Sequence, residues 1–154
     1  MLVTIFADAS WCPETHAGGW AGWAKSQRLK CEGHGQLRDL LPSSNAAEIS
    51  AIGNAVHMAL RKCAAVPGDE LLIQSDCMHA ISVLGSQVRP RNEAEGTVWL
   101  YLCRLRVKYD LEMKYRHVPG HTKGDQPRLY VNNLCDERAK AAMREKRDLL
   151  RNRS

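Results

Sequence analysis

The segment Leu2-Val-Thr-Ile-Phe-Ala-Asp8 decides how this chain folds. It is short, apolar and β-branched up to its final acidic residue, which is typical of a buried strand rather than a helix. Two further strands are expected at 19–24 and 29–37, because turn-forming Pro, Gly and polar residues separate the three segments. Three consecutive strands with short links predict an antiparallel meander.

After this meander the hydrophobic pattern changes from period two to a helical period. From Asn45 apolar residues recur at helical spacing until Pro67-Gly68, and 70–75 is apolar enough to form a central strand. The other expected elements are a short helix at 77–84, a helix with apolar positions between 98 and 109, a strand at 111–118, a loop at 120–133 and a basic terminal helix from about 134 to 151. We therefore predict one α/β domain over residues 1–154, with a mixed five-stranded sheet, three antiparallel strands followed by two with parallel connections, and helices on both faces.

Composition agrees with one soluble domain that binds a polyanion. The chain has 154 residues, 44% of them hydrophobic, and its formal net charge is +5. No apolar run approaches the roughly 20 residues of a membrane span, and no charged-then-apolar leader precedes Leu2. We expect a cytoplasmic monomer without a membrane partner.

The six cysteines favour reduced thiols. No C-x-x-C pair occurs, and structural zinc sites usually contain such close ligand pairs. A zinc site built from cysteines and the six histidines is the weaker alternative.

Four acidic residues, Asp8, Glu48, Asp76 and Asp136, lie at different junctions of the predicted elements. Asp8 and Asp76 end predicted central strands, whereas Glu48 and Asp136 fall in the first turns of predicted helices. The edge of an α/β sheet where such junctions meet is where binding sites assemble. The sequence therefore predicts that four carboxylates gather in one metal-binding cleft.

Each of these residues also has a purely structural explanation. Asn45 with Glu48 resembles a capping box, and Asn133 with Asp136 repeats that spacing more weakly. Asp76 could cap the following helix, and Asp8 could be a turn residue. The sequence does not decide whether the Glu48 side chain points toward the helix cap or across to the sheet edge.

Five motifs occur together in one order along the chain: D-A-S from Asp8, N-A-A-E to Glu48, S-D to Asp76, V-P-G-H-T from Val118, and N-N-L-C-D-E-R-A-K-A-A around Asp136. In order and approximate spacing they resemble type 1 ribonuclease H over roughly residues 3–143. The resemblance implies an RNase H-like fold and endonucleolytic hydrolysis of the RNA strand of RNA:DNA hybrids. It also implies two Mg²⁺ ions, for which Mn²⁺ can substitute.

The resemblance further implies a role for each matching residue. Asp8 would bridge both ions, Asp136 would hold the ion on the nucleophile side, and Glu48 with Asp76 would hold the ion on the leaving-group side. His121 would move protons or help to release product, which suits a side chain that titrates near neutrality. The implied substrate contacts are Ser10, Ser43, Ser44 and Asn45, with Cys77 and Met78 near the ribose 2′-hydroxyls.

The chain also departs from the family pattern. Ala9 and Cys77 stand where glycine and serine are usual, and the basic protrusion of many bacterial members is missing. The basic terminal helix is a candidate source of affinity, although a solvated amphipathic helix is the favoured interpretation. His117 is expected to pack as a structural residue on the apolar face of the last strand. Two rival functions are a resolvase- or transposase-like DNA nuclease and a non-catalytic nucleic-acid-binding module.

Overall fold

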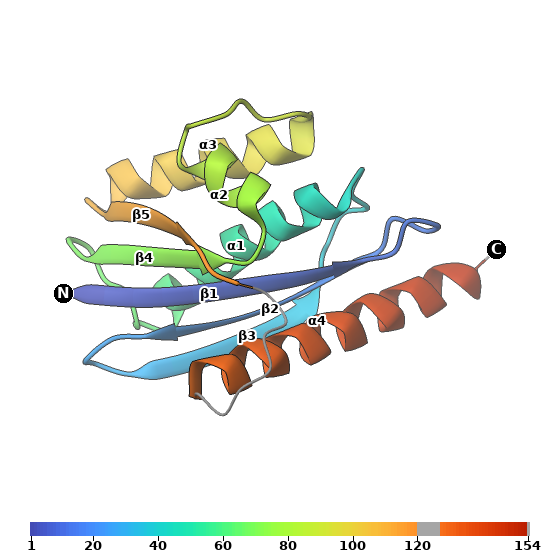
Figure 1. Cartoon of the computed structure of the whole chain (residues 1–154), viewed down its shortest axis with the longest axis horizontal. Coiled ribbons are helices and arrows are strands. Elements are labelled where there is room, and N and C mark those ends of the chain that lie inside the picture. The colour runs from blue at the N-terminus through green and yellow to red at the C-terminus, as the bar shows by residue number, and fades with distance from the viewer. Residues whose placement is uncertain (120–126, 154) are drawn as a thin grey trace.

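A mixed five-stranded sheet lies between helices on both of its faces (Figure 1). The computed structural model describes the backbone of residues 1–119 and 127–153, and the side chains of 1–119 and 132–153. The elements are β1 (Leu2–Trp11), β2 (Gly18–Lys25), β3 (Lys30–Gln36), α1 (Ser44–Arg61), β4 (Glu70–Ser75), α2 (Met78–Leu84), α3 (Glu93–Lys108), β5 (Glu112–His117) and α4 (Pro127–Arg151).

The sheet has the strand order β3-β2-β1-β4-β5. β1, β2 and β3 pair antiparallel as consecutive hairpins, and β4 and β5 add in parallel beside β1. β1 is therefore the central strand, which explains why Val3, Ile5, Phe6 and Ala7 in its middle are buried. The predicted mixed sheet and its helices on both faces are confirmed.

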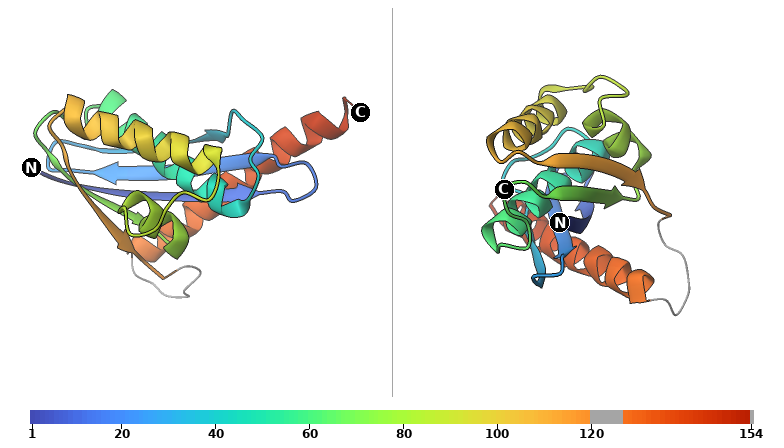
Figure 2. Two further views of the ribbon diagram at one scale, coloured as in Figure 1. Left: turned by 90° about the horizontal axis from the view of Figure 1, so that it is seen from above. Right: turned by 90° about the vertical axis from the view of Figure 1, so that its left-hand side faces the viewer.

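The two faces of the sheet are covered by different helices. α1 packs on β1 and β2, and α3 packs on α1, whereas α4 crosses the opposite face of β1, β2 and β3 (Figure 2). Glycines in β2 allow this close approach, because Gly22 faces Ala55 of α1 and Gly19 faces the backbone of α4 at Ala139. No helix in the described parts of the chain is long and apolar enough to cross a membrane.

Two boundaries differ from those predicted. β1 continues past Asp8 to Trp11, because residues 8–11 pair with 18–21 of β2. α4 begins at Pro127 rather than near residue 134, so the segment expected as loop up to Asn133 is partly helical. Proline is favoured in the first turn of a helix, where its missing N–H costs no hydrogen bond.

A partly buried ion pair ties the β2–β3 turn to the start of β4. Asp69 is 3% exposed, and both of its oxygens accept hydrogen bonds of 2.8 Å from the Arg28 guanidinium. Asp69 Oδ2 also accepts from the backbone N–H of Val66 at 2.9 Å. These bonds, above all those from Arg28, lower the pKa of Asp69 from 3.8 to about 2.

We expect the substitution Asp69→Asn to lower the free energy of unfolding by about 2 kcal/mol at pH 7. The folded-state pKa lies below the unfolded one, so this stability is fully present above about pH 4 and is lost as the pH falls toward 2. Urea unfolding of both proteins between pH 7 and pH 2.5 measures it. A difference that does not shrink at acid pH would contradict the ion-pair explanation.

Candidate active site

Asp8 and Asp76 lie side by side because of the register between β1 and β4. The last parallel pair of these strands joins Phe6 to Gln74. Asp8 lies two residues after Phe6, and Asp76 lies two residues after Gln74. β4 ends at Ser75, so Asp76 stands directly beyond its C-terminal end. Asp8 lies inside β1, opposite Ala21 of β2, where β4 no longer covers it.

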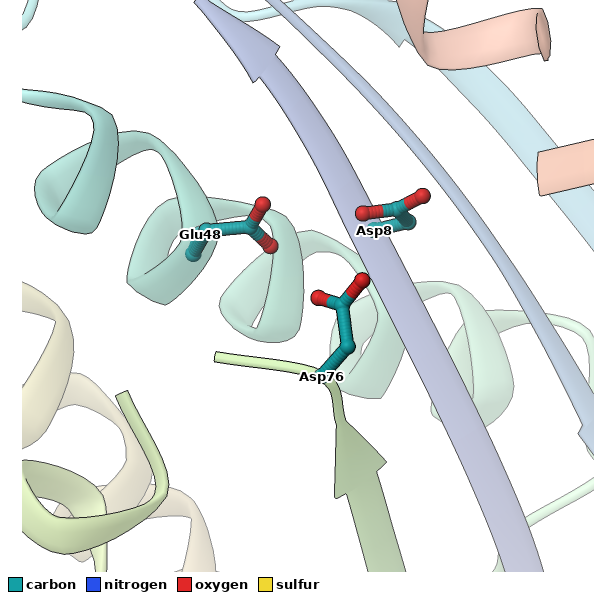
Figure 3. Close-up of side chains that lie close together, drawn as sticks. All are labelled: Asp8, Glu48 and Asp76. Atoms are coloured by element: carbon teal, nitrogen blue, oxygen red, sulfur yellow. The ribbon is translucent and has the colours of Figure 1, made fainter. Parts of the chain in front are cut away.

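Glu48 reaches the same place from α1. The N-cap of this helix is Ser43, whose side chain accepts a hydrogen bond from the backbone N–H of Ala46 at 3.0 Å. Asn45 therefore does not cap the helix, and the capping-box interpretation of Glu48 is wrong. Figure 3 shows the Glu48 carboxylate pointing from α1 toward the carboxylates of Asp8 and Asp76.

The three carboxylates form one compact acidic cluster. Asp8, Glu48 and Asp76 each offer an oxygen, and these oxygens lie within 4.8 Å of one another. Asp76 does not cap α2, because the N-cap position belongs to Cys77. The structure thus brings together three of the four predicted carboxylates around a shared space.

Burial and mutual repulsion make this cluster costly to ionise. Asp8 is 4% exposed, and its burial, followed by the charges of Asp76 and Asp136, raises its pKa from 3.8 to about 8. Burial, with the charges of Asp8 and Asp76, also raises the pKa of Glu48 well above its usual range. The backbone N–H of Ala9 donates to Asp8 Oδ1 at 3.0 Å and opposes the shift only in part.

Asp136 approaches the cluster from α4, on the side of Asp8. Its side chain is close enough to hydrogen-bond Asp8, and this bond contributes to the raised pKa of Asp8. Asp136 Oδ2 also pairs with Lys140 Nζ at 2.9 Å, one helical turn away. Because α4 begins at Pro127, Asp136 lies inside the helix, and both its predicted place in the first turn and the capping alternative with Asn133 are wrong.

The donor set fits a hard divalent cation. Glu48 Oε2 is buried and finds no hydrogen-bond partner among the residues that the structure describes. A buried oxygen without a partner is costly, and a cation beside it would satisfy this atom and neutralise the cluster. Carboxylate oxygens are the ligands that Mg²⁺ and Mn²⁺ prefer, so Asp8, Glu48 and Asp76 could hold such an ion.

The predicted substrate contacts surround these carboxylates on three elements. Ser10 lies two residues beyond Asp8 on β1, and Ser44 and Asn45 form the first turn of α1 behind the Ser43 cap. Asn45 Oδ1 accepts a hydrogen bond from Cys77 Sγ at 3.4 Å, which joins the N-termini of α1 and α2.

On α2 the next residue is Met78, which is 57% exposed at the start of the helix. His121 lies outside the described residues. The roles of the other candidates as substrate contacts stay predictions.

Most of the basic side chains of the terminal helix are engaged within the chain. Arg138 pairs with Glu32, Arg151 with Glu14, and Lys146 donates to the carbonyls of Leu37 and Arg38, alongside the Lys140–Asp136 and Arg147–Asp148 pairs. The contacts of Arg138, Lys146 and Arg151 hold α4 against β3 and the adjoining loops, whereas the other two pairs lie within the helix. They favour a structural role for this helix over a separate nucleic-acid surface.

Two residues at the site were missed by sequence reasoning. Lys140 follows Asp136 by four residues, and the i,i+4 rule for helices could have identified this pair. His117 is exposed rather than packed, and its Nε2 lies 3.1 Å from the backbone oxygen of Asp76. No sequence signal identifies that contact, because it depends on how β5 ends.

A sheet of this order, with carboxylates gathered where β1, β4 and α1 meet, defines the chain as an α/β domain with an acidic cluster that could hold a cation. A family model for RNase H matches residues 2–144, so the chain belongs to the RNase H family, and membership supports a ribonuclease activity. No curated protein matches the chain by sequence.

Solved structures share this fold at low sequence identity. The N-terminal RNase H domain of Rv2228c from Mycobacterium tuberculosis is 15% identical with a TM-score of 0.69, covering 97% of this chain and 98% of that one. RNase H1 from the archaeon Halobacterium salinarum is 15% identical with a TM-score of 0.71, covering 94% and 99%. LC11-RNase H1, solved in complex with an RNA/DNA hybrid, is 12% identical with a TM-score of 0.72, covering 94% and 98%.

Proposed function

We propose that this chain is a single-domain, monomeric endoribonuclease that hydrolyses the RNA strand of RNA:DNA hybrids with two divalent cations, Mg²⁺ or Mn²⁺. The observation that carries the proposal is the acidic cluster of Asp8, Glu48 and Asp76, whose oxygens lie within 4.8 Å of one another. Family membership supports the ribonuclease class. The hybrid bound to LC11-RNase H1, a protein of the same fold, supports the substrate.

Each carboxylate has a defined task in this mechanism. Two divalent cations bound here would supply an activated water and neutralise charge on the phosphoryl and leaving oxygens. Asp8 would contribute oxygens to both cations. Glu48 and Asp76 would help to hold one of them and Asp136 the other, and in the metal-free chain Asp136 pairs with Lys140.

The helix N-termini beside the cluster would orient the substrate. The first amides of a helix have no partner within the helix, so those of Ser44 and Asn45 are suited to a backbone phosphate. Cys77 and Met78, at the start of α2, follow Asp76 and lie where they could contact ribose 2′-hydroxyls. These groups contact backbone and sugar rather than base edges, so cleavage should be largely independent of sequence. His121 is proposed to help proton transfer or product release.

Cleavage assays with end-labelled RNA:DNA hybrid, duplex DNA and duplex RNA test this function. With Mg²⁺ or Mn²⁺ we expect internal cuts in the RNA strand of the hybrid, leaving 3′-hydroxyl and 5′-phosphate ends. Excess EDTA should abolish the cuts. Binding of hybrid without cleavage in either metal would favour a non-catalytic module, and equal cleavage of duplex DNA would favour a resolvase-like nuclease.

A further inference from the structure

His117 stands at the end of β5, beside the residue that carries one of the clustered carboxylates. It is exposed, and its Nε2 lies 3.1 Å from the backbone oxygen of Asp76. A carbonyl oxygen only accepts hydrogen bonds, so Nε2 must carry the hydrogen and donate it. The imidazole is therefore fixed in one orientation against the backbone of Asp76.

The backbone at Asp76 lies just beyond the end of the ladder between β4 and β5. The parallel ladder between β4 and β5 ends with the pair Ser75–His117, and the last ladder-type bond runs from the N–H of Val118 to the carbonyl of Ser75 at 2.9 Å. The next residue, Asp76, lies between the end of β4 and the start of α2. The N–H of Cys77, the residue after Asp76, donates to Ser75 Oγ at 3.1 Å. The His117 side chain supplies a donor to the Asp76 carbonyl beyond the last of these ladder bonds.

The contact matters because Asp76 must aim its carboxylate at a shared space. Its oxygen lies within 4.8 Å of oxygens from Asp8 and Glu48, which β1 and α1 hold in place. Asp76, in contrast, projects from a bend after β4, as Figure 3 shows. A shift of the backbone at Asp76 moves its carbonyl and its side chain together, and so changes the distances among the three carboxylates.

We propose that His117 is a positioning residue for the carboxylate of Asp76, and that it sets the affinity of the acidic cluster for divalent cations. This rests on the proposed function, because it takes the cluster to be the cation site. His117 touches the backbone of a ligand residue rather than substrate. Residues that orient metal ligands typically change affinity about 10- to 100-fold when removed, and a contact through the backbone belongs at or below the lower end of that range.

A simple tether between β5 and β4 is the competing explanation, and it predicts a different result. β5 is already held by six backbone pairs with β4 and by the Val118 bond. Loss of one exposed side-chain hydrogen bond should therefore change stability little. Cation affinity is the measurement that separates positioning from tethering.

The test measures Mn²⁺ binding to the protein without nucleic acid, from the electron paramagnetic resonance signal of free Mn²⁺. His117→Ala should raise the dissociation constant about three- to tenfold. His117→Gln keeps an amide N–H donor at a similar distance from the backbone and should restore most of the affinity. His34→Ala is the matched control, since His34 is also an exposed strand histidine, on β3 at the far side of the sheet.

Hybrid cleavage gives a second readout, in which the Mg²⁺ concentration for half-maximal rate should rise in His117→Ala more than the rate at saturating Mg²⁺ falls. Unchanged Mn²⁺ affinity in His117→Ala, with or without a lower melting temperature, would overturn the proposal. If the wild type binds Mn²⁺ but never cleaves hybrid, the proposed function fails while the affinity series still decides the role of His117. A wild type that binds no Mn²⁺ overturns both.

Discussion

Replacing Asp8 by Asn should abolish hybrid cleavage and, in the same protein, raise the stability of the metal-free fold. Because Asp8 is the carboxylate proposed to contribute to both cation positions, we expect cleavage to fall by about a thousandfold or more. The metal-free fold should become more stable, because burial and the charges of Asp76 and Asp136 disfavour an ionised Asp8 and raise its pKa to about 8. Asn keeps the size of the side chain and removes the charge.

The gain should depend on pH in a defined direction. A carboxyl whose folded-state pKa is raised from 3.8 to about 8 binds protons more tightly in the folded chain than in the unfolded one. Stability of the wild type therefore falls as the pH rises from about 4 to about 8. The melting temperature of metal-free Asp8→Asn should exceed that of the wild type by about 5 °C at pH 8, and the two should converge near pH 4. Calorimetry in EDTA measures the difference.

Asp69→Asn is the matched control for Asp8→Asn. Both aspartates are buried, at 3% and 4% exposure, but their pKa values shift in opposite directions because Asp69 faces Arg28 and Asp8 faces other carboxylates. Asp69→Asn should lose stability and keep cleavage, whereas Asp8→Asn should do the reverse. An Asp8→Asn protein that still cleaves hybrid at a wild-type rate would contradict the assignment of Asp8 as a cation ligand.

The strands were the most predictable part of the fold, because their apolar residues alternate or form short β-branched runs between turn signals. The end of β1 was less predictable. Asp8 and Ser10 have low strand propensity, and these positions are extended because they pair with Ala21 and Gly19 of β2. Long-range pairing overrides local preference there, and a single strand read by itself does not contain that information.

The direction of each acidic side chain required the structure. Both Ser43 and Asn45 are good N-cap residues, and only the observed bond from the Ala46 N–H to Ser43 leaves Glu48 to face the sheet edge. For Asp136, the polar residues before it suggested a loop, although Pro127 is well suited to the first turn of a helix. His117 fits the alternation expected for β5, but it lies at the end of this strand, where its side chain is exposed.

Gly19→Ala should detach or displace α4 and so reduce both stability and cleavage. A Cβ atom on Gly19 would lie 2.2 Å from the carbonyl oxygen of Ala139 and 2.5 Å from the backbone nitrogen of Met143. Both are backbone atoms of a long helix, which cannot move aside as a flexible side chain can. We expect the free energy of unfolding to fall by about 3 kcal/mol.

Cleavage should fall with stability for a geometric reason. Ala139 lies three residues after Asp136 on α4, so the helix turn that would meet the new methyl group is the one next to the carboxylate beside Asp8. Displacing that turn moves Asp136 away from the cluster, while Glu48 and Asp76, held by α1 and β4, stay in place. Urea unfolding and hybrid cleavage at a temperature where the variant remains folded separate the two effects.

Gly35→Ala gives the matched control in the neighbouring strand. A Cβ at Gly35 in β3 would approach only the indole Nε1 of Trp20, at 3.3 Å, which a small side-chain shift relieves. This variant should stay within about 1 kcal/mol of the wild type and cleave hybrid normally. If Gly19→Ala were equally harmless, α4 could not be docked against β2 as closely as the structure places it, and Asp136 would have to reach Asp8 by another route.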